Sequence, residues 1–172
     1  MSCLNIVVVL DGFQHGEMPF FVKAVAFASL RNQVYRQRQF DTTELLTHSQ
    51  DALRTYRFQS QLHGWPLHSP GLPQCAMDTA LLIYLQDTLL DTFEDGCPVP
   101  LAITMWTKGR YIRDLIATWV SELPDLAVPI IVRTLDDIDC PPARELIPAD
   151  RPFTTKRKAL AYAEWMKRNH LG

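Results

Sequence analysis

The chain has 172 residues, of which 47% are hydrophobic and 21% are charged, and its formal net charge is −2. This composition is that of a globular domain and excludes an intrinsically disordered chain. The small negative charge gives no overall attraction to nucleic acid, so any such binding must use a local basic patch. The sequence contains no internal repeat or linker, and we predict a single domain over residues 1–172.

Cysteine usage and hydropathy indicate the compartment. The cysteines at positions 3, 75, 97 and 140 form no C-x-x-C pair, which favours reduced thiols in a cytoplasmic or nuclear protein. The sequence has no 18-residue apolar run and no basic region ahead of its first hydrophobic stretch. We therefore expect an intracellular protein that is not secreted and does not associate with a membrane.

The first three predicted elements are strands. Residues 5–10 are wholly apolar, which is typical of a strand that is buried on both faces. Residues 20–30 follow a turn that contains glycine and proline, and residues 33–40 follow a tight connection at Arg31-Asn32. Alternation along these runs predicts a meander of antiparallel strands, the third of them partly exposed.

The period becomes helical after Asp41. The tetrapeptide Asp41-Thr42-Thr43-Glu44 is similar to a capping box, which predicts that a helix begins there. A loop is expected at 59–74, a helix at 75–93, a strand at 99–106, a helix at 109–123, a strand at 128–132, a proline-rich loop at 140–148 and a last helix at 153–170.

Three antiparallel strands followed by strand–helix alternation is the order of the ribonuclease H-like fold. This is an α/β architecture with a mixed sheet and helices on both faces, whose later strands lie parallel. Its first strand is central, and the carboxyl end of that strand opens on the site. Asp11 ends the first predicted strand and is therefore a candidate metal ligand.

An ordered series of stretches carries a resemblance to a known family. They are V-L-D-G-F at 9–13, F-V-K-A-V-A at 21–26, H-G-W-P-L-H-S-P-G-L-P at 63–73, W-T-K-G-R-Y-I-R-D-L at 106–115, C-P-P-A-R-E-L at 140–146 and K-A-L-A-Y-A-E-W-M at 158–166. With them the chain resembles the DEDD-type 3′–5′ exonuclease superfamily. Within it the chain is most similar to a divergent, uncharacterised group associated with arthropods, viruses and mobile elements, which implies a viral or mobile-element origin.

The resemblance implies four carboxylates around two Mg²⁺ or Mn²⁺ ions. Asp11 matches the first carboxylate, whereas Phe13 and Tyr111 stand where the second and third are expected. In the last motif Arg157 stands for the histidine and Tyr162 for the aspartate. We predict an inactive, exonuclease-like protein without a metal cofactor, in which Phe13, Tyr111 and Tyr162 converge on the vacated site. Asp11 would then cap a turn or pair with Arg157.

Two alternatives stay open. Relocated ligands would make the chain an active exonuclease that depends on Mg²⁺ or Mn²⁺ and binds the metal with Asp11. A plugged cleft would instead favour a structural or assembly protein that works through a protein partner or a homo-oligomer. The carboxylates that could supply relocated ligands are Asp114, Asp136, Asp137, Asp139 and Glu164.

Basic residues are the candidates for binding. Residues 151–168 hold six Lys/Arg and one acid, and in the expected fold Arg157 faces the old cleft. These residues predict a surface for the phosphates of single-stranded nucleic acid or RNA. The other interpretation is a solvated helix face. The candidates are Arg36, Arg38, Lys108, Arg110, Lys156, Arg157 and Lys158.

Three further patterns are weaker. The set His63, His68 and Cys75, with Cys97 or Cys140 as a fourth member, lacks the tight spacing of a zinc module, and a packed loop is favoured. Nothing in the sequence positions a histidine and an acid to activate Cys75 or Cys140 as a nucleophile. Thr107-Lys108-Gly109 lacks the full spacing of a phosphate loop and is interpreted as a strand-to-helix turn.

Overall fold

The computed structural model describes residues 3–31, 35–94, 100–126, 128–148 and 152–170. Within these ranges, five strands form one mixed sheet in the order β3-β2-β1-β4-β5. The first three strands pair antiparallel, and β4 and β5 continue parallel to β1. The α/β class and the expected order of strands are confirmed, but the predicted proline-rich loop at 140–148 contains a short helix, Ala143–Leu146. The strands are β1 (Cys3–Phe13), β2 (Phe21–Ser29), β3 (Tyr35–Gln39), β4 (Ala102–Thr107) and β5 (Ile130–Thr134).

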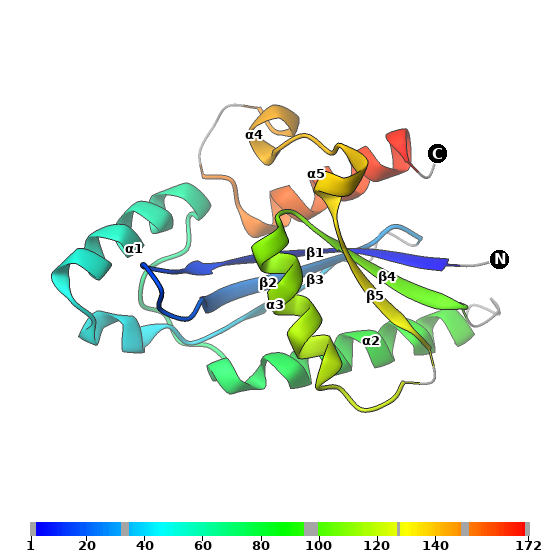
Figure 1. The fold of residues 1–172 in the computed structure, drawn as a ribbon, viewed down its shortest axis with the longest axis horizontal. Coiled ribbons are helices and arrows are strands. Elements are labelled where there is room, and N and C mark those ends of the chain that lie inside the picture. Colours follow the sequence, from blue (N-terminus) through cyan, green and yellow to red (C-terminus); the bar gives the residue numbers. More distant parts are fainter. Residues whose placement is uncertain (1–2, 32–34, 95–99, 127, 149–151, 171–172) are drawn as a thin grey trace.

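Helices cover both faces of the sheet. Figure 1 shows α2 and α3 on one side, α4 and α5 on the other, and α1 beyond the end of β1. Among the described residues no helix is both long and apolar enough to cross a membrane. The helices are α1 (Gln50–His63), α2 (Met77–Glu94), α3 (Arg110–Ser121), α4 (Ala143–Leu146) and α5 (Thr155–Asn169).

Alternation along β1 explains the two layers. Ile6, Val8 and Leu10 pack in the core that α2 and α3 cover, whereas Val7 and Val9 pack in the core beneath α5. β1 lies between β2 and β4, and helices pack on both of its faces. It is therefore buried on both faces, as its apolar run predicts. Successive side chains of a strand point to opposite faces, so Asp11 shares the α5 side with Val7 and Val9.

A β-bulge lies beside Asp11. Asp11 pairs with Ala24 and Gly12 pairs with Val22, so Lys23 is the extra residue on β2. A Cβ atom on Gly12 would lie 2.1 Å from the carbonyl oxygen of Phe21. The close approach of the two strands at the bulge therefore requires glycine at position 12.

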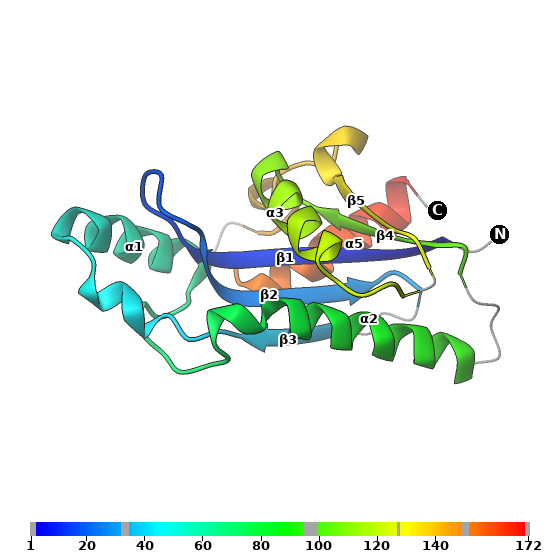
Figure 2. The same cartoon turned by 60° about the horizontal axis from the view of Figure 1, so that its bottom comes forward.

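Lys23 is fully buried although it is a lysine in a strand. Its ammonium group donates to the carbonyl oxygens of Phe40 at 2.9 Å and Ser69 at 3.3 Å. Burial lowers the pKa of Lys23, and the nearby carboxylate of Asp41 opposes this effect. The lysine thereby joins the loop after α1 to the end of the sheet. The path of this loop can be followed in Figure 2.

The first helix begins later than predicted. The Asp41 carboxylate caps only a 3-10 turn, Thr43–Thr47, by accepting the Thr43 N–H at 2.8 Å. The N-cap of α1 is Ser49, whose hydroxyl accepts the Ala52 N–H at 3.2 Å. The helix then continues into the predicted 59–74 loop and ends at Gly64, where φ is 79°. This last turn carries His63 to the candidate site.

Candidate functional site

Asp11 lies at the carboxyl end of β1 and is 6% exposed. The hydroxyl of Thr155 donates to its Oδ2 atom at 2.6 Å, and the ammonium group of Lys158 forms an ion pair with Oδ1. Both residues come from the first turn of α5. The expected pair of Asp11 with Arg157 is wrong, because Lys158 forms the ion pair instead. The Arg157 guanidinium donates to the Pro152 carbonyl oxygen at 3.4 Å.

A chain of hydrogen bonds joins Asp11 to the end of α1. The Trp65 indole donates to the Thr155 hydroxyl at 2.7 Å, and the Trp65 backbone N–H donates to Nδ1 of His63 at 3.1 Å. Nδ1 therefore accepts, and Nε2 of His63 donates to the Gly12 carbonyl at 3.0 Å. Burial lowers the pKa of His63, although Asp11 and the Gly12 carbonyl oppose the effect. The His63 ring thereby ties the end of α1 to the end of β1 at Gly12.

A second lysine–carboxylate pair lies at the carboxyl ends of β4 and β5. The Lys108 ammonium pairs with Asp136 and donates to the Cys140 carbonyl at 2.6 Å. Asp136 also accepts the Gly109 N–H at 3.0 Å and the Thr134 hydroxyl at 2.9 Å. Burial alone would raise the pKa of Asp136, but these hydrogen bonds outweigh it and leave the pKa lowered. The interpretation of Thr107-Lys108-Gly109 as a strand-to-helix turn is confirmed.

Two cavities adjoin at this edge of the sheet. One has a volume of about 200 Å³ and is lined by Lys108, Lys158 and Tyr162 among apolar neighbours. The other has a volume of about 300 Å³ and is lined by aromatic and polar groups that include Phe20, Asp11, His63 and Phe153. Both cavities share Leu10 and Lys158. We name the joined cavities the carboxyl-edge cleft, with a cationic half and an aromatic half.

The predicted convergence of three aromatic side chains is wrong. Phe13 is fully buried against α1, with its ring centroid 6.0 Å from that of Tyr56 and 5.1 Å from that of His63. Tyr111 is 52% exposed on α3, where its hydroxyl accepts a hydrogen bond from Gln14 at 2.9 Å. Tyr162 alone of the three lines the cationic half, and burial raises its pKa to about 12.

The basic candidates do not form one surface. Lys108 and Lys158 meet in the cationic half of the cleft, and Arg110 is exposed at the start of α3. Lys156 lies over the Tyr35 ring, 5.6 Å from its centroid. Arg36 and Arg38 instead line a separate slot between β3 and α2.

The residues at this edge do not fit a pair of divalent metal ions. Asp11 already has both oxygens engaged by Thr155 and Lys158. Of the carboxylates considered as relocated ligands, Asp114 and Glu164 pair with Arg113 and Arg168 on their own helices. Within the described ranges no group of three or more His, Cys, Asp or Glu side chains is placed to hold a metal ion.

The zinc and cysteine patterns, which the sequence did not favour as sites, can also be located in the structure. Both ring nitrogens of His63 are engaged, so His63 is not placed as a zinc ligand. Cys3, Cys75 and Cys140 are free thiols, and Cys97 lies outside the described residues. Burial raises the pKa of the Cys140 thiol to about 11, which makes it a poor nucleophile.

Sequence reasoning missed Thr155 and Trp65. Thr155 follows the helix N-cap Thr154 and carries no motif of its own, and Trp65 lies in the 59–74 segment that the sequence predicts as a loop. Their roles depend on contacts between distant segments, which no local pattern encodes.

Comparisons with known proteins found no match for this chain among family models, curated proteins or solved structures. The function therefore has to be argued from the geometry of the cleft.

Proposed function

We propose that the chain is a catalytically inactive, ribonuclease H-like and exonuclease-like protein that binds single-stranded nucleic acid in the carboxyl-edge cleft. The strand order, with β1 at the centre and antiparallel to β2 alone, supports this fold assignment. The cleft lies where parallel strands of such sheets place their ligands, at the carboxyl ends of β1 and β4.

The observation that carries the proposal is the ammonium group of Lys158 beside Asp11. A nuclease of this fold would use that carboxylate for a metal ion, and here a protein cation takes the position. Only 18% of the Lys158 side chain and 7% of the Asp11 side chain are exposed, so the pair is a built part of the fold. A fixed cation can neutralise a phosphate but cannot activate a water molecule for its cleavage.

The two halves of the cleft match the two parts of a nucleotide. An ammonium group has three N–H donors, so a lysine that pairs with one carboxylate can still donate to a phosphate. Lys108 and Lys158 provide two such groups in the cationic half. Phe20 and Phe153 provide apolar ring surfaces in the aromatic half, and bases stack on such rings without regard to sequence.

The test measures the affinity of the full chain for a fluorescein-labelled, single-stranded oligonucleotide, as DNA and as RNA, at several salt concentrations. The informative variant is Asp11→Asn/Lys158→Met. It removes the ammonium group of Lys158 from the cleft and leaves the net charge of the chain unchanged. We expect this variant to weaken binding about tenfold and to lower the salt slope by about one counterion.

A matched control removes an ion pair from the same helix. The variant Glu164→Gln/Arg168→Met is also neutral in total charge and lies on the exposed carboxyl half of α5. It should bind as the parent does. Equal affinity of the parent and the Asp11→Asn/Lys158→Met variant would rule out the cleft as the binding site. Shortening of the labelled strand by the parent in Mg²⁺ or Mn²⁺ would instead support the active-exonuclease alternative.

A further inference from the structure

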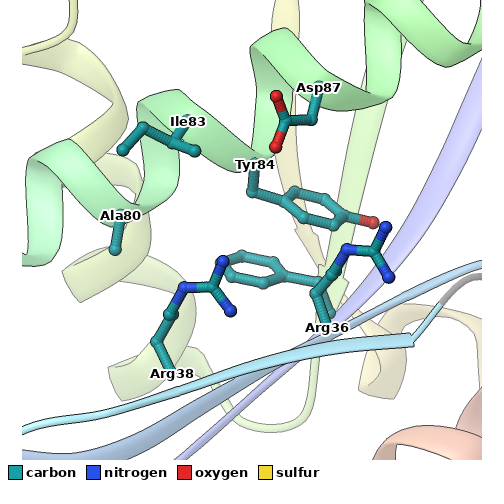
Figure 3. Close-up of a pocket in the computed structure, with 7 residues that line it drawn as sticks. Arg36, Arg38, Ala80, Ile83, Tyr84 and Asp87 are labelled. Atoms are coloured by element: carbon teal, nitrogen blue, oxygen red, sulfur yellow. The ribbon is translucent and has the colours of Figure 1, made fainter.

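The slot that holds Arg36 and Arg38 lies away from the cleft, on the edge strand β3. Figure 3 shows both arginine side chains extending from β3 toward α2, Arg36 beside Tyr84 and Arg38 on the side of Ala80. The slot has a volume of about 10 Å³, which is room for little more than one water molecule. It is therefore too small to enclose a small-molecule ligand, and its two guanidinium groups are available only to a partner that lies on the surface.

Among the residues that the structure describes, β3 pairs with a strand on one side only, that of β2. Phe40 donates to the Lys23 carbonyl at 2.8 Å, so residues 36, 38 and 40 direct their backbone groups toward β2. By alternation, Tyr35, Gln37 and Gln39 direct theirs outward. At the carboxyl end, Leu72 already pairs with this side, because its N–H donates to the Gln39 carbonyl at 3.0 Å. The edge therefore accepts backbone partners.

The arginines cover the remaining outward carbonyl groups. A guanidinium N–H of Arg38 donates to the Gln37 carbonyl at 2.9 Å, and one of Arg36 donates to the Tyr35 carbonyl at 3.4 Å. Both contacts are exposed and come from flexible side chains of the same strand. Charged side chains that mask an edge in this way prevent unspecific pairing between sheets. They can also be drawn away by a carboxylate, which then leaves the carbonyl groups free to pair.

We propose that the β3 edge binds an acidic segment of a partner protein as an added, extended strand. Alternate residues of a strand lie about 6.8 Å apart on one face. Acidic side chains at alternate positions of the partner would thus meet Arg36 and Arg38 across the strand pair, beside the exposed side chain of Ile83. The partner's own N–H groups would replace the guanidinium groups on the carbonyls of Tyr35 and Gln37.

The backbone geometry favours a peptide over nucleic acid at this edge. A phosphodiester chain offers acceptors that suit the arginines, but DNA has no backbone donors for the two outward carbonyl groups, and RNA has only its 2′-hydroxyl groups, which lack the spacing of a strand's N–H groups. A peptide strand offers both kinds of group. The charge of the slot is consistent with an acidic partner, because it contains two guanidinium groups and the single carboxylate of Asp87.

The test uses a fluorescein-labelled, eight-residue peptide that alternates threonine and glutamate, titrated with the full chain. We expect saturable binding that weakens about tenfold in the Arg36→Ala/Arg38→Ala variant, the effect of two cross-strand ion pairs. The control Arg54→Ala/Arg57→Ala removes the same charge from exposed positions of α1 and should bind as the parent does. A peptide with glutamine in place of glutamate should bind about tenfold more weakly.

Backbone pairing is tested separately. The variant Gln37→Pro removes an outward N–H but no hydrogen bond to β2, and it should weaken binding. If this variant does not fold, a peptide that is N-methylated at alternate residues makes the same test from the ligand side. The proposal is overturned if the parent does not bind the peptide, if the arginine variant binds as tightly as the parent, or if backbone changes have no effect. It is also overturned if a single-stranded oligonucleotide displaces the peptide and loses its own affinity in the arginine variant.

Discussion

Lys158 forms an ion pair with Asp11 across 147 positions of sequence, where the carboxyl end of the central strand meets the first turn of α5. Thr155 completes the arrangement by donating to the other carboxylate oxygen. Burial removes most of the water that would solvate the Asp11 carboxylate. Its negative charge is therefore stabilised by these two donors instead.

Removing the lysine alone should therefore be costly. We expect Lys158→Met to lower the free energy of unfolding by about 3 kcal/mol, because Asp11 would be left buried without a counter-charge. In Asp11→Asn/Lys158→Met, where neither charge remains, the loss should be about half as large. Urea denaturation of both single variants and the double variant gives the coupling energy. A coupling energy near zero would mean that the pair contributes nothing to stability.

Gly12 should not tolerate a side chain. We expect Gly12→Ala to cost about 3 kcal/mol, because the new Cβ would meet the Phe21 carbonyl oxygen at 2.1 Å and force the bulge open. Gly16→Ala is the matched control, since a Cβ there has nothing within 4 Å and only its φ of 58° is unfavourable. That control should cost about 1 kcal/mol. Thermal unfolding measures the loss of stability in the two variants. Equal losses in the free energy of unfolding would contradict the bulge geometry.

Stability should depend on pH through His63. Burial holds its pKa in the folded state below the unfolded value of about 6.5. The unfolded chain therefore binds a proton first as the pH falls, and stability is fully present above pH ~6.5 and declines below it. The variant His63→Gln keeps a donor for the Gly12 carbonyl but does not titrate. The difference in unfolding free energy between parent and variant should change from pH 7.5 to pH 5.5, and a constant difference would count against a buried neutral His63.

The start of α1 can be tested at its N-cap. We expect Ser49→Ala to cost about 1 kcal/mol, because the Ala52 N–H would lose its hydrogen-bond acceptor. Asp41→Ala should have a smaller effect on helix content, because Asp41 caps only the preceding 3-10 turn. Circular dichroism and urea denaturation of the two variants distinguish them. A larger effect of Asp41→Ala than of Ser49→Ala would instead support a helix that begins at Asp41, as expected from the sequence.

The sheet was predictable because its apolar runs are unambiguous. The runs around Val8 and Met105 have no helical period, and both form buried strands. The start of α1 was not predictable, because Asp41 and Ser49 are both good N-cap residues and only packing chooses between them. Lys23 was missed because a lysine in a strand indicates a solvated position, and its burial depends on the Phe40 carbonyl after β3 and on the Ser69 carbonyl of a distant loop.

Asp11 lies near the carboxyl end of β1, as the sequence predicts, but its partners Thr155 and Lys158 were not predicted. Arg157 and Lys158 are adjacent, and they point about 100° apart around the helix axis. One residue of uncertainty in the helix register therefore changes which cation meets Asp11. Phe13 shares the parity of Asp11, yet it lies beyond the bulge at the end of β1, where the strand pairs with β2 and packs against α1, a contact that strand alternation alone does not predict.

The separation of Asp11 from Thr155 by 144 positions has a consequence for biosynthesis. A chain leaving the ribosome exposes β1 well before α5, so the carboxylate cannot meet its two donors until Lys158 has emerged. Contacts between such distant segments form slowly, because a long loop must close before they are made. We therefore expect the docking of the last helix to be the late, slow step of folding, and a ribosome-bound chain that stops before Thr155 to remain open at this corner.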